Sequence, residues 1–512
     1  MPQDSTSLRS TSPCWIVLGN KVYDATPYLY ERAEKSAALV ERDGPEALHA
    51  TDESRKIRLP GIPEYLPEEA CLGTIDGPTR SSFLASIASK NAAPLSPEVV
   101  LANSEAPHIS SIITLNDFEA AAKAVLPLDL WTYISSSAHD GSALRGNLAS
   151  WEAIRFRPRI LRNVEFLKPR TSILGSESAF PFFVSSMGQL GRGKPSGEIG
   201  AVRVLARCGI HGVLSAESTA EMEDIVAAFL EEKAKLSAAR KESSRNNSAA
   251  TALEPSPEAQ LHYQLYIPAD RMIGIQRIRR ARATGVFRSL WLTVDAPQLG
   301  KRTAARKLQA TVTLAKSPEE ASQAGFGVGS HASSSSLNAS LTWSDLKWIK
   351  DEWGGPIVLK GVQTMEDVLH AVDLGIDGVL LSNHGGRQMH DAVDALTVLL
   401  EIRAYRPTLL DRIEIFVDGG CRDGADVLKA VSLGAKAVGV GRPFFYAFAV
   451  YGEDGVQRCA SILVDELHTA MKLLGIGSIE EARPEFVNTS RLLDGIWRPL
   501  DLDSHVHSPR QL

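Results

Sequence analysis

Residues 377–442 constrain the fold more than any other part of this chain. Short apolar runs of strand length alternate there with stretches in which apolar residues recur at helical spacing, and glycines follow each apolar run. The predicted strands are 379–382, 414–418 and 437–440, and the predicted helices are 392–404 and 424–433. This alternation predicts parallel strands joined by crossover helices.

Two loops of this segment have the composition of an anion-binding site. DGGCR at 418–422 lies between a predicted strand and a predicted helix, and GRP at 441–443 follows the next strand. Glycine lets backbone N–H groups approach an anion, a helix start adds a favourable dipole, and arginine adds charge. Because the loops after strands seven and eight of a (β/α)8 barrel usually bind phosphate, we assign these two loops to those positions. The alternative is a pair of ordinary turns with solvated arginines.

A third loop, SNHGGRQ at 382–388, places His384 and Arg387 at the carboxyl end of a predicted strand. Barrel enzymes keep their catalytic groups at these strand ends. A lone histidine is more often structural. A histidine and an arginine on a glycine-containing loop beside a phosphate site instead indicate acid–base chemistry on an anionic substrate.

These motifs resemble those of the FMN-dependent 2-hydroxy acid oxidase and dehydrogenase family, which includes glycolate oxidase, lactate oxidase, mandelate dehydrogenase and flavocytochrome b2. SNHGGRQ, VDGGCRDG (417–424) and GRPFFYA (441–447) occur in the family's order, and the resemblance extends from about residue 113 to about residue 475. The resemblance implies an FMN cofactor. The layout is most similar to flavocytochrome b2, in which a cytochrome b5 domain precedes the flavin barrel.

Five further apolar runs, at 182–186, 211–215, 262–267, 290–295 and 357–361, bring the predicted strands to eight. The expected fold is therefore α/β, a (β/α)8 TIM barrel at 111–500, preceded by a small α+β cytochrome b5-like domain at 10–77 and a linker at 78–110. A helix at 113–124, with Asn116 near its N-cap, is expected to lead into the barrel. Two low-complexity segments interrupt it. We predict a mobile surface insertion at 231–260 and a flexible loop over the catalytic face at 307–341.

The N-terminal domain keeps the outline of cytochrome b5 without its haem ligands. Trp15–Leu18 and Lys21–Asp24 flank Gly19-Asn20 as in a hairpin, and residues 62–76 resemble the segment that leaves such a domain. Where the family has a histidine followed by Pro-Gly-Gly, this chain has Arg32-Ala33-Glu34-Lys35, and the second axial histidine falls near Ile57. Because haem iron needs axial ligands and His49 is out of register, we expect no haem and interpret the domain as a relic kept for packing or partner contacts.

Composition narrows the partners and the compartment. A net charge of -6 gives no basic field, which argues against nucleic-acid binding. The five cysteines lack the spacing of a metal site or a disulfide framework and predict a reducing compartment. No apolar run is long enough to cross a membrane, and the first dozen residues lack the pattern of a signal peptide or a mitochondrial presequence. The expected location is the cytoplasm.

The resemblance assigns a residue to each task that oxidation of a 2-hydroxy acid requires. His384 matches the catalytic base, and Asp295 matches the carboxylate that pairs with it and raises its basicity. Tyr266 matches the tyrosine that holds the substrate hydroxyl. Arg387 and Arg302 match the clamp for the substrate carboxylate, because a planar guanidinium fork fits a carboxylate better than an ammonium group does.

The flavin contacts follow from the same resemblance. Lys360 matches the lysine beside the N1 and O2 edge, where positive charge stabilises the reduced anionic flavin, and Ser186 stands in the run that lies under the flavin. The other residues that match flavin contacts are Ser215, Gln264 and Thr293 at the ring, and Asp418, Gly420, Arg422, Gly441 and Arg442 at the ribityl and phosphate groups.

Several departures from the family concern the substrate. The run after the first strand is Ser186-Met187-Gly188 where relatives have Ala/Pro-Thr-Ala, and Glu217 stands where relatives carry Trp or Leu. Tyr133 matches the first of two aromatic positions, of which the second is Ile134, and residues 303–305 lack the acidic side chains that often follow the clamp arginine. A glycine and a glutamate predict a larger, more acidic pocket. The expected substrate is a bulky 2-hydroxy acid, or an equivalent group on a larger metabolite with a cationic or hydrogen-bonding part.

The expected reaction converts a 2-hydroxy acid to the 2-oxo acid. Without haem the electrons cannot leave through the N-terminal domain, so oxygen is the expected acceptor and hydrogen peroxide the product. The alternatives are a dehydrogenase with another acceptor, another FMN-dependent oxidation of a larger metabolite, and a flavin-binding scaffold without turnover. The retained His384, Arg387, Asp295 and Tyr266 argue against the scaffold. The resemblance also implies a homo-oligomer, a tetramer.

Overall fold

The computed structural model describes residues 105–246, 257–316 and 337–498, together with four short strands before residue 105. The chain divides into two compact units, Met1–Ser96 and Pro97–Leu512.

The first unit contains a four-stranded sheet in the order β3-β1-β2-β4. Its strands are β1 (Trp15–Leu18), β2 (Lys21–Asp24), β3 (Leu48–Ala50) and β4 (Cys71–Thr74). β1 pairs antiparallel with β2, which confirms the predicted hairpin around 19–20. Arg32 and Ile57, on which the prediction of missing haem ligands depends, lie outside the described residues, and so do residues 78–104 of the predicted linker.

The second unit is a closed barrel of eight parallel strands, as the alternating sequence predicts. Neighbouring strands follow chain order, and the last strand pairs with the first. The strands are β8 (Phe182–Val184), β9 (His211–Ser215), β10 (Leu261–Leu265), β11 (Phe287–Thr293), β12 (Ile357–Val362), β13 (Gly378–Leu381), β14 (Glu414–Asp418) and β15 (Ala437–Val440). Each lies within three residues of its predicted bounds at either end.

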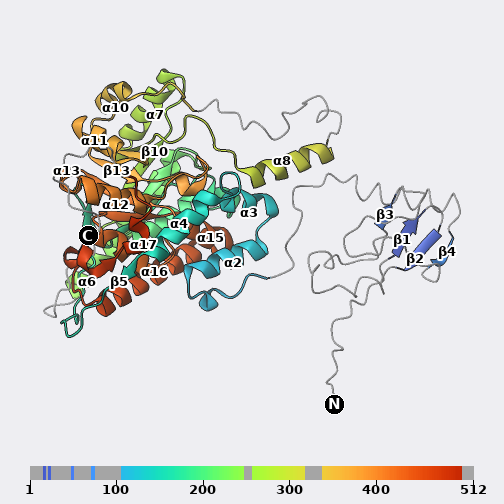
Figure 1. Ribbon diagram of the computed structural model, residues 1–512, viewed down its shortest axis with the longest axis horizontal. Coiled ribbons are helices and arrows are strands. Elements are labelled where there is room, and N and C mark those ends of the chain that lie inside the picture. The colour runs from blue at the N-terminus through green and yellow to red at the C-terminus, as the bar shows by residue number, and fades with distance from the viewer. Residues whose placement is uncertain are drawn as a thin grey trace, which may run out of the picture. The chain divides into compact units, whose positions relative to one another are not determined.

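Helices surround these strands, as Figure 1 shows. The α-helices are α2 (Leu115–Val125), α3 (Leu128–Ser135), α4 (Ser142–Ala153), α5 (Gly197–Cys208), α6 (Met222–Asn246), α7 (Arg271–Ala283), α8 (Thr303–Lys316), α10 (Leu346–Trp353), α11 (Met365–Asp373), α12 (Ala395–Tyr405), α13 (Leu409–Arg412), α14 (Gly424–Ser432), α15 (Arg442–Tyr451), α16 (Glu453–Leu474) and α17 (Ser490–Leu493). Short 3-10 helices include η4 (Leu190–Arg192), η6 (Trp343–Asp345) and η7 (His384–Gly386). No helix in the described part of the chain combines the length and hydrophobicity that a membrane span requires.

The barrel interior is a packed core. Phe183, Trp291 and Phe416 project inward from three strands, and the Trp291 ring centroid lies 5.0 Å from Phe183 and 5.3 Å from Phe416. A hairpin of β6 (Thr171–Ile173) and β7 (Ser176–Ser178) adds Ile173 to the same cluster. Because side chains fill the interior, ligands are confined to the loops at the strand ends.

Two local predictions need correction. The N-cap of α2 is Thr114, which forms a capping box with Asp117, because its hydroxyl precedes the first helical residue and Asn116 lies inside the helix. Residues 307–316, predicted as loop, belong to α8, which has apolar residues at helical spacing. Residues 231–246 of the segment predicted as an insertion are helical, since α6 continues to Asn246. Residues 247–256 and 317–336 lie outside the described part.

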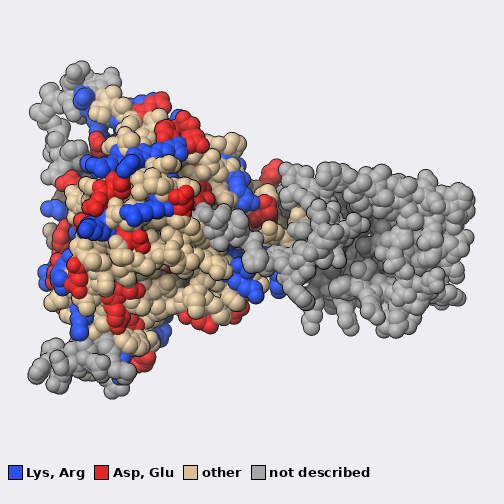
Figure 2. Space-filling model, turned by 90° about the horizontal axis from the view of Figure 1, so that it is seen from above, with Lys and Arg blue, Asp and Glu red and all other residues tan. Residues whose placement is uncertain are grey.

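Charges on the surface are mixed in sign. On the face seen in Figure 2, lysine and arginine side chains alternate with aspartate and glutamate across the barrel unit. This face therefore presents no basic field of the kind that binds a nucleic-acid backbone.

Candidate active site

The carboxyl ends of the barrel strands and the loops that follow them enclose a cavity of about 520 Å³. All but two of the site residues predicted from the sequence line it: Tyr133, Ser186, Ser215, Glu217, Gln264, Tyr266, Arg302, Lys360, His384, Arg387, Asp418, Gly420, Arg422, Gly441 and Arg442. The other two contact this set directly. Thr293 accepts a hydrogen bond from Gln264 at 2.9 Å, and Asp295 is hydrogen-bonded to His384.

His384 and Asp295 form a buried pair. Nδ1 of His384 lies 3.1 and 3.2 Å from the two carboxylate oxygens of Asp295, which leaves Nε2 facing the cavity, 3.5 Å from the hydroxyl oxygen of Tyr266. Gly361 makes this approach possible, since a Cβ there would lie 2.5 Å from Cβ of Asp295. Asp295 therefore fixes the tautomer of His384 and leaves Nε2 as the atom that exchanges protons.

Burial and charge act against each other in this pair. Burial lowers the pKa of His384 below its ordinary value, and the Asp295 carboxylate offsets part of this effect. Burial alone would raise the pKa of Asp295, but the charges of His384 and Lys360 bring it below the ordinary value. Burial, assisted by Asp295, raises the pKa of Tyr266, so its hydroxyl remains a donor at neutral pH. His384 therefore presents an unprotonated imidazole beside the protonated phenol of Tyr266.

Two arginines face the same cavity without carboxylate partners in the described part of the chain. Arg387 donates through Nη1 to the carbonyl oxygens of Tyr133, Ile134 and Ser136 at the end of α3, where free carbonyls and the helix dipole favour a cation. Nε of Arg302 is buried and has no hydrogen-bond partner among the described residues. Burial lowers the pKa of both guanidinium groups. The charge of Arg302 adds to the lowering of the Arg387 pKa, so an anion bound near both groups would offset their mutual repulsion.

The two glycine-containing loops at 418–422 and 441–443, which the sequence assigns to phosphate binding, line the cavity. Gly420, at a φ of 94°, packs against α4, where a Cβ would lie 2.3 Å from the Asn147 carbonyl oxygen. Gly441 faces open space, since only Cβ of Ser185 would lie within 4 Å of a Cβ there. Arg422 lines the cavity beside these glycines. Arg442 does so too, but its Nε and Nη2 donate to carbonyl oxygens of Ile134, Ser136 and Gly385, so it also helps to cap α3.

These residues fit FMN. Oδ1 of Asp418 is buried without a hydrogen-bond partner among the described residues and would accept from a ribityl hydroxyl. The Lys360 side chain is buried, and its nearest described hydrogen-bond partner, Oγ of Ser382, lies at 3.5 Å, which leaves its charge free for an electron-rich ring edge. Gln264 is held across three strands, because its Oε1 accepts from Ser215 and its Nε2 donates to Thr293. The residues that line the cavity thus include a glycine cradle, an acceptor for a ribityl hydroxyl and a cation for the ring edge.

Glu217 lines the cavity from the loop after β9. Its carboxylate has no hydrogen bond or ion pair with the described residues. Gly188 was expected to widen the pocket, but a Cβ at Gly188 would lie 3.0 Å from both Cβ and the carbonyl oxygen of Glu217. A side chain at position 188 would therefore crowd Glu217 where the two loops meet, and the acidic character of the pocket comes from Glu217.

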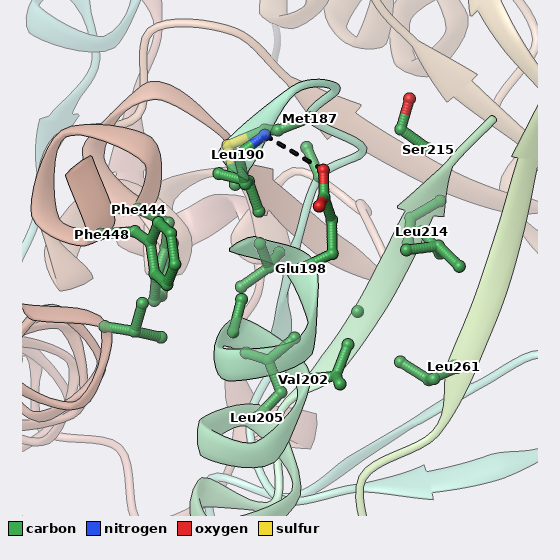
Figure 3. Close-up of a pocket in the computed structure, with 16 residues that line it drawn as sticks. Met187, Leu190, Glu198, Val202, Leu205, Leu214, Ser215, Leu261, Phe444 and Phe448 are labelled. Carbon is green, nitrogen blue, oxygen red and sulfur yellow. Dashed lines mark hydrogen bonds between the residues drawn. The ribbon is translucent and has the colours of Figure 1, made fainter. Parts of the chain in front are cut away.

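Sequence reasoning missed Glu198, which joins these same two loops. Glu198 lies in the first turn of α5, is buried, and accepts hydrogen bonds from Leu190 N at 3.0 Å, Thr219 N at 3.0 Å and the Thr219 hydroxyl at 2.6 Å. Figure 3 shows its carboxylate reaching Leu190 beside an apolar cavity of about 40 Å³ that Val202 and Leu205 help to line. Its position near the start of a helix was the only signal in the sequence.

Sequence reasoning also missed Arg306, which lines the cavity from α8 one helical turn after Arg302. Its helix had been predicted as loop, so no spacing argument could orient its side chain. Arg306 adds positive charge on the side of the cavity that α8 forms.

A family model described as FMN-dependent dehydrogenase matches residues 122–489. The L-lactate dehydrogenase (cytochrome) of Wickerhamomyces anomalus is 34% identical over 488 residues, covering 93% of this chain and 77% of that protein. The 2-hydroxyacid oxidase 2 of Mus musculus is 34% identical over 388 residues, covering 75% of this chain and all of that protein. A solved structure of a flavocytochrome b2 double mutant with pyruvate bound matches with a TM-score of 0.64 and 33% identity, over 84% of this chain and 98% of that chain.

Proposed function

Because the chain belongs to the FMN-dependent dehydrogenase family and oxidises 2-hydroxy acids to 2-oxo acids with FMN as cofactor, we propose that molecular oxygen is its electron acceptor. The substrate would lose two electrons and two protons, and oxygen would take them to form hydrogen peroxide. The support is the absence of a histidine at Arg32 and Ile57, where the family's cytochrome domain has its haem ligands. The similarity to an oxidase over that enzyme's whole length points the same way.

The observation that carries the chemistry is the His384–Asp295 pair beside two arginines without carboxylate partners in the described chain. The substrate carboxylate would bind between Arg302 and Arg387, which share one wall of the cavity. Nε2 of His384 would then take a proton from the CH–OH group, and Asp295 would stabilise the imidazolium that forms. Tyr266 would orient the substrate hydroxyl as its hydrogen-bond partner.

FMN, when bound, supplies the acceptor for the two electrons that leave the substrate carbon. The loops at 418–422 and 441–443 would hold its phosphate and ribityl groups, and Gln264 and Thr293 its ring. Lys360 would place positive charge at the ring edge. Because these residues come from the ends of six strands, closure of the barrel is what aligns cofactor, base and clamp.

We also propose that the preferred substrate is a bulky 2-hydroxy acid with a cationic or hydrogen-bond-donating side chain. Glu217 supports this, because it lines the cavity and its carboxylate has no partner among the described residues. A ligand donor would satisfy it, whereas a short aliphatic acid such as lactate would leave it unpaired.

The visible spectrum of the purified protein, recorded without oxygen against a panel of 2-hydroxy acids, tests the reaction. A flavin spectrum that one acid bleaches and air restores, with stoichiometric hydrogen peroxide, is the expected result. A Soret band would show haem and overturn the argument from Arg32 and Ile57. A bleached flavin that air does not restore would replace oxygen with another acceptor.

Two variants test the substrate side chain. Glu217→Leu should weaken the preferred substrate by about 10- to 100-fold in kcat/KM and favour simple aliphatic acids. Glu217→Gln keeps the shape and the hydrogen-bonding capacity, so it separates the charge from the volume. If both variants keep the substrate preference of the wild-type enzyme, Glu217 does not select the substrate side chain.

We also propose that the N-terminal domain at 10–77 binds no haem, that the protein is cytoplasmic, and that it forms a homotetramer. Cys208, Cys421 and Cys459 are free thiols, which suits a reducing compartment. Light scattering on the purified protein tests the tetramer, and cell fractionation tests the location.

A further inference from the structure

The loop that carries His384 has a backbone conformation that most residues avoid. His384, Gly385 and Gly386 have φ angles of 61°, 62° and 75°. Left-handed backbone is available to glycine but unfavourable for histidine, whose Cβ crowds the neighbouring carbonyl oxygen. Contacts outside these three residues must therefore hold His384 in this conformation.

A pair of buried asparagines makes such contacts. Nδ2 of Asn147 donates to Oδ1 of Asn383 at 2.8 Å, and Nδ2 of Asn383 donates to Oδ1 of Asn147 at 2.7 Å. Only 1% of Asn147 and 2% of Asn383 is exposed. The reciprocal bonds leave each amide one orientation, so the pair is a rigid link between α4 and the residue that precedes His384.

Asn383 uses its remaining bonding capacity to close the loop. Its Oδ1 also accepts from Gly386 N at 2.9 Å, and its Nδ2 also donates to the Val393 carbonyl oxygen at 3.1 Å. Both amide hydrogens and both acceptor positions of Asn383 are therefore occupied. The side chain spans the left-handed turn from its start to its far end.

Asn147 also lies against the loop assigned to the flavin phosphate. A Cβ on Gly419 would lie 3.0 Å from Nδ2 of Asn147, and one on Gly420 would lie 2.3 Å from its carbonyl oxygen. One helical turn later, Trp151 donates from Nε1 to the Gly419 carbonyl oxygen at 2.8 Å. Helix α4 thus braces two loops that follow neighbouring strands, and Asn147 is not among the residues that line the cavity.

From this geometry we infer that Asn147 and Asn383 are a positioning pair: they hold His384 in its left-handed conformation, with Nε2 directed at the substrate, and tie its loop to the glycine loop of the flavin site. The inference rests on the role proposed for His384. It does not depend on which 2-hydroxy acid or which electron acceptor the enzyme uses.

Two variants of Asn147 test the pair. Asn147→Leu removes both reciprocal bonds at similar volume, and Asn147→Asp keeps the shape but places an acceptor opposite Oδ1 of Asn383. Ser150→Ala is the control, because Ser150 is buried in the same helix and donates only to the Asn147 carbonyl oxygen. Should Asn147→Leu fail to fold, the isosteric Asn147→Asp carries the test.

The measurements are kcat per bound flavin, KM, and hydrogen–deuterium exchange of the 382–393 peptide in the holoenzyme. We expect both Asn147 variants to lower kcat about 10- to 100-fold with KM within about threefold, since small displacements of a catalytic group have effects of this size. Exchange in 382–393 should accelerate, and Ser150→Ala should keep kcat within about twofold. A kcat within twofold of wild type in the Asn147 variants, or unchanged exchange, would overturn the inference.

The second half of the link has its own test. Trp151→Phe removes the hydrogen bond to Gly419 and leaves the asparagine pair intact. It should raise the Kd for FMN about 10-fold while kcat per bound flavin stays within about twofold of wild type. Each comparison uses whichever acid bleaches the wild-type flavin. A wild-type protein whose flavin no 2-hydroxy acid bleaches would therefore contradict the proposed function, while the exchange experiment would still report on the asparagine pair.

Discussion

Arg302 and Arg387, which we propose to bind the substrate carboxylate, should have opposite effects on stability. Arg387 donates to three carbonyl oxygens at the end of α3, and Arg302 has a buried Nε without a partner among the described residues. Substitution by methionine keeps most of the apolar length and removes the charge in each case. The comparison separates what a cation does for the fold from what it does for the ligand.

The magnitudes follow from the hydrogen bonds. A buried unsatisfied donor costs about 1–3 kcal/mol, so Arg302→Met should raise the free energy of unfolding by an amount up to about that size. Arg387→Met removes two N–H donors, each contributing about 1.5–3 kcal/mol in a charged hydrogen bond. Arg442 still donates to Ile134 O at 3.2 Å and to Ser136 O at 3.4 Å, which offsets part of the loss. We expect Arg387→Met to lower the free energy of unfolding by about 3 kcal/mol.

Denaturant unfolding of the holoenzymes, with flavin and tryptophan fluorescence as probes, measures the difference. Both variants should lose at least about 100-fold in kcat/KM, because each removes one arm of a buried charge-assisted clamp. The expected order of stability is Arg302→Met, then wild type, then Arg387→Met. An Arg302→Met protein as destabilised as Arg387→Met would refute the claim that Arg302 is an unpaired cation kept for its ligand.

Three further predictions concern Asp295, His211 and Glu198, which are not among the residues that line the active-site cavity. Asp295→Asn removes the charge that holds the pKa of His384 up, so the acid limb of the kcat/KM profile should move to lower pH while kcat falls about 100-fold or more; an unmoved limb would contradict the pairing. Burial lowers the pKa of His211 from 6.5 to about 4, so only the unfolded chain binds this proton as the pH falls from 6.5 to 4. The free energy of unfolding should therefore fall by about 3 kcal/mol across that window. Acid unfolding curves should show that His211→Gln regains part of this loss. Glu198→Gln keeps the two bonds from backbone N–H groups but loses the acceptor for the Thr219 hydroxyl, so unfolding experiments should show a loss of about 1–3 kcal/mol, and no loss would mean that the loops do not depend on it.

Local pattern was a reliable guide wherever a short-range rule applied. Strands buried on both faces are continuous apolar runs, and glycine marks the loops that follow them, so the eight strands and their parallel order could be predicted. The same rules failed at residues 307–316 of α8, because these residues were assigned to one loop together with the serine-rich run at 331–340. They also misplaced the cap of α2, since Asn116 and Thr114 are both good cap residues and only the backbone distinguishes them.

The residues of the site also fall into two groups, those that a sequence motif identifies and those that it does not. His384, Arg387, Asp418 and the glycines beside them stand in recognisable motifs, because their chemistry requires particular residue types at strand ends. Glu198 and Asn147 stand in no motif. Each is a polar residue in a helix, where it would ordinarily be expected to face solvent.

The sequence by itself determined which residue types follow which strand, and therefore the barrel and the inventory of its catalytic end. Only the tertiary structure showed that Arg387 is hydrogen-bonded while Nε of Arg302 has no partner among the described residues. It also showed that Gly188 packs closely on Glu217 and that Asn147 meets Asn383 across 236 positions of the chain. The physical reason is the distance along the chain over which each kind of interaction acts. Strand and turn preferences act over a few neighbouring residues, whereas buried hydrogen-bond partners are chosen by the closure of the whole barrel, which no local spacing records.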